Sequence, residues 1–264
     1  MGVGGAGRAA SGGGGRGGDI IWAMAATPAD ARVRGRRGGD DDVDLEKLVA
    51  DQPLFHQYRD GTMASWAIDR KPLEFICRHV RPGMRTLETG AGHSTVAFAI
   101  AGADHICVTP SVAEAERIEA YCRENGLSPR IRFVHESSEF ALARPDALPE
   151  ELDFVLIDGA HRFPYAILDW HYTDSKLRAG GFVGIDDYRM PSVNVLCRFL
   201  DGEDDWELVE TTDNTAFYRK LRVPVVTSDW QHQKMNAADR WPGPAGPAGP
   251  VGWKDRARRL LGRP

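Results

Sequence analysis

Residues 85–94 read RTLETGAGHS, and this stretch decides the fold class. A strand-like run, Arg85–Glu88, passes through Gly90 and Gly92 into a helix-like segment over residues 94–101. Glycine permits a tight turn that brings backbone N–H groups against a ligand. The N-terminus of the following helix favours a carboxylate or a phosphate. The stretch therefore predicts a strand, a ligand-binding turn and a helix.

The same alternation continues along the chain. Further strand-like runs lie at residues 106–109, 131–135, 154–158 and 182–186, and helix-like stretches lie at 113–125, 164–177 and 192–200. Strands separated by helices imply parallel pairing with right-handed crossovers. Residues 206–211 and 215–220 flank the turn Asp213-Asn214 and indicate an antiparallel hairpin. We therefore predict an α/β fold: a doubly wound, mostly parallel, Rossmann-like seven-stranded sheet with a C-terminal β-hairpin.

Composition divides the chain of 264 residues into one domain with two flanking segments. Residues 1–41 are rich in glycine and arginine without periodicity, and we expect them to be disordered. Met24 is an alternative translation start to Met1. Residues 42–223 form the predicted domain, which consists of N-terminal helices over 42–82 and a core over 83–223. The helices are expected because apolar residues recur at helical spacing from 45 to 55 and from 66 to 80. Residues 224–264 are expected to be a Pro/Gly-rich linker and a short basic tail.

The composition also bears on location and partners. No apolar run approaches the roughly 20 residues that span a bilayer, and no signal peptide is evident. The four cysteines are widely spaced, which favours free thiols in a reducing cytoplasm. A net charge of −5 argues against general attraction to nucleic acid. We therefore expect a cytoplasmic protein that acts on a small molecule, without nucleic-acid or membrane partners and with its oligomeric state open.

The acid before the glycines indicates which class of ligand the turn binds. Glu88 would not help to bind a dinucleotide pyrophosphate, but its carboxylate suits an α-amino group. Over residues 66–220 the sequence resembles the class I S-adenosylmethionine-dependent methyltransferases, whose first motif is an acid followed by Gly-x-Gly. The resemblance implies that Glu88 faces the methionyl amino group, directly or through water. It also implies that Gly90, Gly92 and Ser94 line the methionine tail.

One departure from this family lies after the second predicted strand. The family usually has an acid there that accepts hydrogen bonds from the ribose, whereas this chain reads Val108-Thr109-Pro110, with Glu114 as the first acid further on. Thr109 is the expected ribose contact, because its hydroxyl can accept a hydrogen bond without a charge. After the third strand, Ser137 is the expected contact at the adenine edge.

Acids gather after the fourth and fifth predicted strands. Residues 152–161 read LDFVLIDGAH and residues 182–188 read FVGIDDY, so Asp158, Asp186 and Asp187 close neighbouring strands. Three uncompensated carboxylates repel and raise one another's pKa, and Mg²⁺, which takes oxygen ligands, would relieve that repulsion. His161 lies three residues past Asp158 and could take a proton from a bound hydroxyl.

This layout resembles the metal-dependent O-methyltransferases of the catechol and macrolide-sugar types. The resemblance implies that Asp158, Asp186 and Asp187 bind Mg²⁺, that His161 is the base and that a small-molecule hydroxyl is the acceptor. Trp66 and Arg70 are candidates for a lid, with core packing the alternative for Trp66. Solvated strand-end acids and a helix-capping His161 are the structural alternative for the site. The functional alternatives are a catalytically inactive methyltransferase-fold binding protein and an NAD-dependent oxidoreductase, which the missing third glycine disfavours.

Overall fold

The computed structural model describes residues 44–127, 129–144, 146, 148–223 and 233–234. The predicted N-terminal segment, residues 1–41, lies outside the described residues. Of the predicted C-terminal segment, residues 224–264, only residues 233 and 234 are described. The domain boundaries at 42 and 223 therefore remain predictions.

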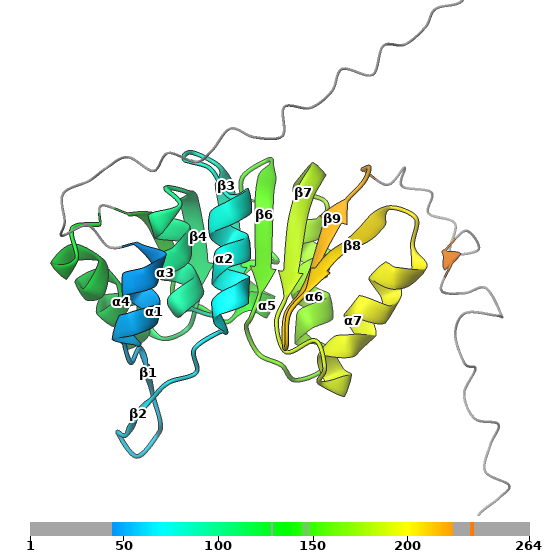
Figure 1. Ribbon diagram of the computed structural model, residues 1–264. Helices are drawn as coiled ribbons and strands as arrows, with labels where there is room; N and C mark the ends of the chain where they lie inside the picture. Colours follow the sequence, from blue (N-terminus) through cyan, green and yellow to red (C-terminus); the bar gives the residue numbers. More distant parts are fainter. Residues whose placement is uncertain (1–43, 128, 145, 147, 224–232, 235–264) are drawn as a thin grey trace, which may run out of the picture. The chain divides into compact units, whose positions relative to one another are not determined.

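A seven-stranded sheet forms the centre of the described domain (Figure 1). The strand order is β5-β4-β3-β6-β7-β9-β8, with the first five parallel and β9 antiparallel to both β7 and β8. This confirms the doubly wound, mostly parallel sheet with a terminal hairpin. The strands are β3 (Arg85–Thr89), β4 (Asp104–Val108), β5 (Arg130–Val134), β6 (Leu152–Ile157), β7 (Leu177–Ile185), β8 (Trp206–Thr211) and β9 (Ala216–Lys220).

Strand register aligns the carboxyl ends of four parallel strands. Thr89 at the end of β3 lies beside Val108 in β4 and beside Ile157 in β6. Ile157 in turn lies beside Ile185, the last residue of β7. The residues that follow these strands therefore meet at one edge of the sheet, where ligands bind in open α/β folds.

Helices cover both faces of the sheet (Figure 1). Successive strand residues point to opposite faces, so Val155 packs in one apolar cluster and Leu156 in the other. Because both faces are buried, residues 154–157 of β6 read as a continuous apolar run. One cluster contains residues of α1 (Leu45–Asp51), α2 (Arg70–His79), α3 (His93–Ile100) and α4 (Val112–Glu124). The other contains residues of α5 (Ser138–Ala141), α6 (Tyr165–Asp174) and α7 (Pro191–Gly202).

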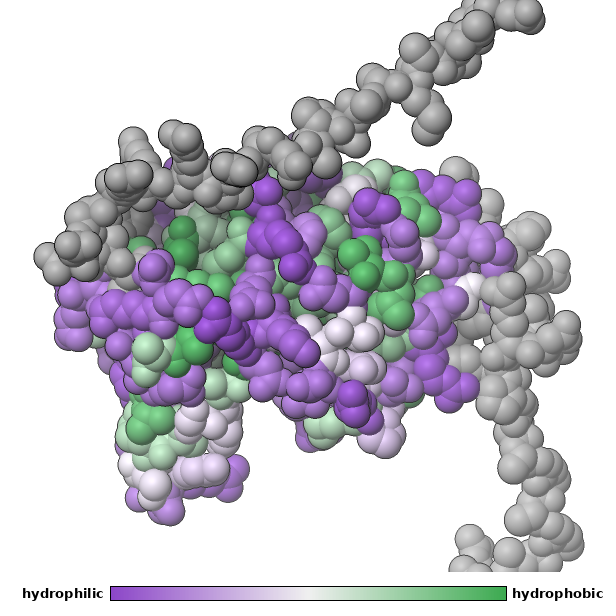
Figure 2. Space-filling view, viewed as in Figure 1, coloured by the Kyte–Doolittle hydropathy of each residue, from purple (hydrophilic) through white to green (hydrophobic). Residues whose placement is uncertain are grey.

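The surface follows from these amphipathic elements. Figure 2 shows a face that is mainly hydrophilic, with apolar side chains reaching the surface over β8 and β9, where Leu208 and Val209 are exposed. Within the described residues, no helix is long and apolar enough to cross a membrane. All four cysteines are free thiols, as their spacing predicted.

The region before the sheet differs from the sequence prediction. Helix α1 ends at Asp51, because Gln52 adopts a left-handed conformation and Pro53 cannot continue the helix. A small antiparallel hairpin follows, β1 (His56–Gln57) and β2 (Met63–Ala64), which the helical spacing did not predict. Helix α2 begins only at Arg70, so Trp66 lies in the connecting segment instead of in a helix. This segment and the hairpin lie at the carboxyl edge of the sheet.

Candidate active site

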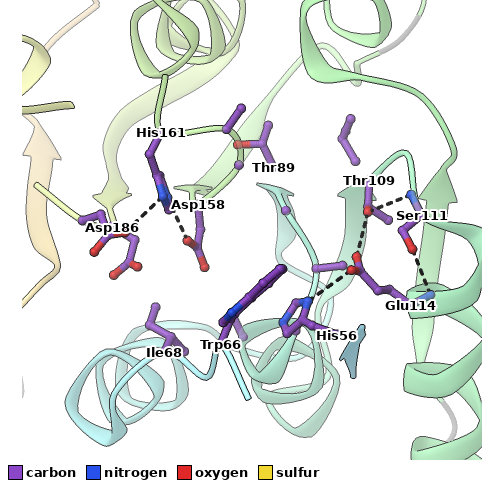
Figure 3. A pocket seen from close by; sticks show the side chains of 18 of the residues that line it. His56, Trp66, Ile68, Thr89, Thr109, Ser111, Glu114, Asp158, His161 and Asp186 are labelled. Atoms are coloured by element: carbon purple, nitrogen blue, oxygen red, sulfur yellow. Dashed lines mark hydrogen bonds and ion pairs between the residues drawn. The ribbon is translucent and has the colours of Figure 1, made fainter. Parts of the chain in front are cut away.

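A cavity of about 660 Å³ opens at the carboxyl edge of the sheet. Its walls are the glycine turn after β3, the residues after β4, β6 and β7, the start of α5, and residues 66–69. Cavities of roughly 300–1,000 Å³ hold small ligands and cofactors. Figure 3 shows two groups of polar side chains in it: Asp158, His161 and Asp186 on one side, and Thr109, Glu114 and His56 on the other, with Trp66 between them.

Gly90 is required by its backbone conformation and by a close neighbour, whereas Gly92 only lies close to a side chain. Gly90 has a φ of 89°, in the left-handed region that favours glycine. A Cβ at Gly90 would also overlap the backbone carbonyl oxygen of Asp158. A Cβ at Gly92 would lie 3.3 Å from Nε2 of His56. Gly90 thus allows the turns after β3 and β6 to pack together, and both glycines line the cavity as predicted.

Glu88 lies beneath this turn and does not line the cavity. Its side chain is fully buried on the α3 side of β3, where Oε1 accepts hydrogen bonds from the Thr95 hydroxyl and from Nε2 of His105 (3.1 Å). The Thr95 hydroxyl oxygen also accepts from the backbone N–H of Gly92 (3.0 Å). Alternation along β3 turns Glu88 toward α3, where it supports the turn through Thr95, while Thr89 lines the cavity. The expected contact of Glu88 with the methionyl amino group, directly or through water, stays a prediction.

Glu114 brings a carboxylate to the end of β4. It lies in the first turn of α4, whose N-cap Ser111 accepts from the Glu114 backbone N–H (3.3 Å). Oε2 of Glu114 accepts from the Thr109 hydroxyl (3.3 Å), and Oε1 contacts Nδ1 of His56 (3.2 Å). Thr109 lines the cavity as predicted, but its hydroxyl hydrogen is directed to Glu114. The sequence had marked Glu114 only as the first acid after this strand, and nothing in it indicated His56.

Ser94 and Ser137 both reach the cavity, where they were expected. Ser94 is the second residue of α3 and is buried. Ser137 precedes α5, and its hydroxyl donates to the carboxylate of Glu139. Of the two lid candidates, Trp66 lines the cavity and stays about half exposed (55%). Arg70 pairs with Glu46 and Glu74 at the start of α2 and is not among the residues that line this cavity.

An acid–histidine cluster lies at the ends of β6 and β7. His161 faces Oδ1 of Asp158 through Nε2 (3.5 Å) and contacts Oδ2 of Asp187 through Nδ1 (3.0 Å). Asp186 is buried and accepts from the Thr215 hydroxyl. Burial, together with the neighbouring Asp158, raises the pKa of Asp186 to about 8. Burial also raises the pKa of Asp158, whereas the Asp158 carboxylate raises the pKa of His161.

The donor atoms that come together differ from the predicted trio. One donor atom each of Asp158, His161 and Asp186 lies within 4.8 Å of the others, and Asp187 is not part of this group. Asp187 follows Asp186 directly and has a left-handed φ of 50°, so its carboxylate turns to Nδ1 of His161. Two ligands of one Mg²⁺ lie at most about 4.2 Å apart, so small rotamer changes would close the set. Nε2 of His161 is buried with no hydrogen-bond partner among the described residues. Asp158 and Asp186 therefore fit a divalent cation, with His161 beside them.

Comparisons with known proteins agree with this fold. Residues 87–188 match the sequence model of a methyltransferase domain family. The fold is similar to a putative O-methyltransferase from Klebsiella pneumoniae (14% identity, TM-score 0.52, covering 67% of this chain and 89% of that chain). It is also similar to the O-methyltransferase TomG from Streptomyces achromogenes, a structure in complex with SAM (18% identity, TM-score 0.50, the same coverage). A search of curated protein sequences gave no match.

The strand order is that of the predicted Rossmann-like sheet, its cavity opens at the carboxyl edge, and residues 87–188 resemble a methyltransferase domain. The fold is shared with the two O-methyltransferases named above. The match to a methyltransferase domain favours a methyltransferase over the NAD-dependent oxidoreductase that the sequence left as an alternative.

Proposed function

We propose that this protein transfers a methyl group from S-adenosylmethionine to a hydroxyl oxygen of a small molecule. The observation that carries the proposal is the buried Nε2 of His161, which has no hydrogen-bond partner among the described residues. Asp187 contacts the other ring nitrogen at 3.0 Å and fixes the orientation of the imidazole. An imidazole held by one carboxylate, whose second nitrogen makes no hydrogen bond within the described chain and faces Asp158 at 3.5 Å, is the arrangement of a general base. The O-methyltransferases of similar fold support this choice of acceptor atom.

Each group of cavity residues has its own role in the proposed reaction. With the proton of the imidazole on Nδ1 and donated to Asp187, Nε2 keeps a lone pair that takes the hydroxyl proton of the acceptor. The acceptor oxygen then forms its bond to the methyl carbon as the bond from that carbon to sulfur breaks. Asp158 and Asp186 would hold a divalent cation, which supplies positive charge to a bound hydroxyl. The glycine turn and Ser94 bind the methionine portion of the cofactor.

The charge of the cavity determines which methyl acceptors it can bind. Five acidic side chains line it (Asp69, Glu114, Asp158, Asp186, Asp187), and among its described lining residues there is no lysine or arginine. The pKa of Asp186 is raised to about 8, so the negative charge at neutral pH comes mainly from the other acids. A cleft lined by one sign of charge concentrates ligands of the opposite sign. The cavity therefore favours the cationic sulfonium of the cofactor and a neutral or cationic acceptor. Acceptors that carry phosphate or carboxylate groups are disfavoured.

The proposal can be tested by turnover and binding together. Purified protein is incubated with S-adenosylmethionine, Mg²⁺ and a panel of hydroxylated small molecules, and S-adenosylhomocysteine formation is measured. His161→Ala is expected to lower turnover by about 10²–10⁴-fold while calorimetry shows unchanged S-adenosylhomocysteine binding. His171→Ala is the matched control, because His171 lies on α6 and is not among the residues that line the cavity. Full turnover of His161→Ala would refute the role of His161 as base.

Two further outcomes separate the parts of this proposal. Activity that survives a chelator would leave His161 as a base that acts without a metal. Binding of S-adenosylhomocysteine without turnover on any acceptor would favour the alternative that the sequence left open, a catalytically inactive methyltransferase-fold binding protein.

A further inference from the structure

We propose that Glu114 accepts hydrogen bonds from the ribose hydroxyls of S-adenosylmethionine, and that His56 makes the N-terminal hairpin part of the cofactor site. This inference rests on the cofactor of the proposed function. It assigns the ribose to a helix residue, whereas the sequence predicted Thr109 at the end of the strand.

The position of Glu114 is the first support. It lines the cavity, and its side chain is 17% exposed, so the carboxylate is largely withdrawn from solvent but open to a ligand. Helix α4 begins directly after the strand end, with Ser111 as its N-cap. A first-turn residue of this helix therefore projects back over the end of β4, where no acid occurs in the sequence Val108-Thr109-Pro110.

The carboxylate of Glu114 is held in place before any ligand binds. Thr109 donates to one oxygen at 3.3 Å, and Nδ1 of His56 contacts the other at 3.2 Å. An ionised carboxylate has about four acceptor sites, so each oxygen keeps capacity for another donor. Two adjacent oxygens match two adjacent ribose hydroxyls, both of which can donate. Because the side chain is already fixed, little rotamer freedom is lost when the sugar binds.

Three of the other four cavity acids are committed elsewhere. Asp158 and Asp187 contact His161 and Asp186 is bound by Thr215, all at the ends of β6 and β7. Figure 3 shows Glu114 on the opposite side of the cavity, next to Thr109 and His56. A cofactor with its methyl group near His161 and its methionine portion at the glycine turn would place its sugar on this side.

His56 extends the site to the hairpin. Its ring lies 5.1 Å from the ring of Trp66, and its Nε2 is the atom that a Cβ at Gly92 would meet at 3.3 Å. One imidazole therefore contacts the carboxylate, the glycine turn and the half-exposed tryptophan. A change at His56 should weaken cofactor binding through Glu114.

Calorimetry with S-adenosylhomocysteine tests the assignment on the full chain. Glu114→Gln keeps the size of the side chain but removes its charge, and we expect affinity to fall roughly tenfold or more. Glu116→Gln, an exposed position on the same helix, is the control and should bind as the unaltered protein does. His56→Ala is expected to give a smaller loss than Glu114→Gln. Thermal unfolding of each variant checks that it is folded.

A second ligand separates a direct contact from a general disturbance. The unaltered protein should bind the 2′-deoxy analogue of S-adenosylhomocysteine more weakly than the parent, whereas Glu114→Gln should discriminate much less between them. Equal binding of S-adenosylhomocysteine by Glu114→Gln and the unaltered protein would overturn the inference, as would undiminished discrimination in the variant. No binding by the unaltered protein would instead overturn the proposed function itself.

Discussion

Glu88 shows how a fully buried acid can act on a site that it does not touch. Its carboxylate accepts from Thr95 and from His105, and Thr95 accepts from the backbone of Gly92. His105 is itself bonded to the hydroxyl of Thr86 at 2.8 Å. This chain of hydrogen bonds under the turn fixes the position of Gly92, which faces the cavity. Glu88 is therefore a positioning residue.

Glu88→Gln should destabilise the protein, because an amide cannot accept two charge-assisted hydrogen bonds as a carboxylate does. We expect the free energy of unfolding to fall by about 1–3 kcal/mol. S-adenosylhomocysteine affinity should fall with it, since the turn loosens. Urea unfolding and calorimetry measure the two effects. Unchanged stability with lower affinity would instead indicate that Glu88 reaches the ligand, directly or through water.

The residues at the strand ends could be predicted because parallel strands bring their carboxyl ends together. Asp158, His161 and the glycine turn were placed in this way, and the structure brings them to one cavity. The direction of a side chain was harder to predict: Asp187 turns to His161 because of its left-handed backbone, and Glu88 faces α3. His56 could not be predicted, because it reaches the site from a hairpin with no sequence motif.

At the scale of elements, the sheet was predictable and the segment before it was not. Continuous apolar runs, separated by helix-length segments, identify the strands of a doubly wound fold, since both faces of the sheet are buried. The hairpin β1–β2 has two residues in each strand, too few to show a period. Likewise, α6 ends at Asp174, and β7 begins at Leu177, where the sequence predicted helix.

Helix α6 carries a buried charge that gives a pH-dependent prediction. Asp169 is 1% exposed, and neither carboxylate oxygen has a hydrogen-bond partner among the described residues. Burial raises the pKa of Asp169 from 3.8 to about 6. A raised folded-state pKa gives stability that is present at low pH and lost as the pH rises through that value. Asp169→Asn should therefore raise the free energy of unfolding by about 3 kcal/mol at about pH 7 and by less than about 1 kcal/mol at about pH 4.

Urea unfolding of both proteins across this pH range provides the measurement. The unaltered protein should lose stability relative to the variant as the pH rises from about 4 to about 7. Parallel stability curves would show that Asp169 is paired in solution.

At the scale of the whole molecule, the acidic cavity predicts how salt affects ligand binding. S-adenosylmethionine carries a positive sulfonium that S-adenosylhomocysteine lacks, and five acidic side chains line the cavity. Raising ionic strength screens attraction between charges. The affinity for S-adenosylmethionine should therefore fall with salt more steeply than the affinity for S-adenosylhomocysteine. Calorimetry with both ligands at low and high ionic strength checks this, and equal slopes would contradict it.

The reversed direction of β9 has a practical consequence for handling the protein. Ala216 lies beside Ile185 at the edge that carries the cavity, and Arg219 lies beside Phe182, further from that edge. The described chain therefore leaves the sheet, after Lys220, on the side away from the cavity. An affinity tag or surface linker joined after residue 223 would begin on that side. Protein anchored in this way should still exchange cofactor and acceptor freely with the surrounding solution.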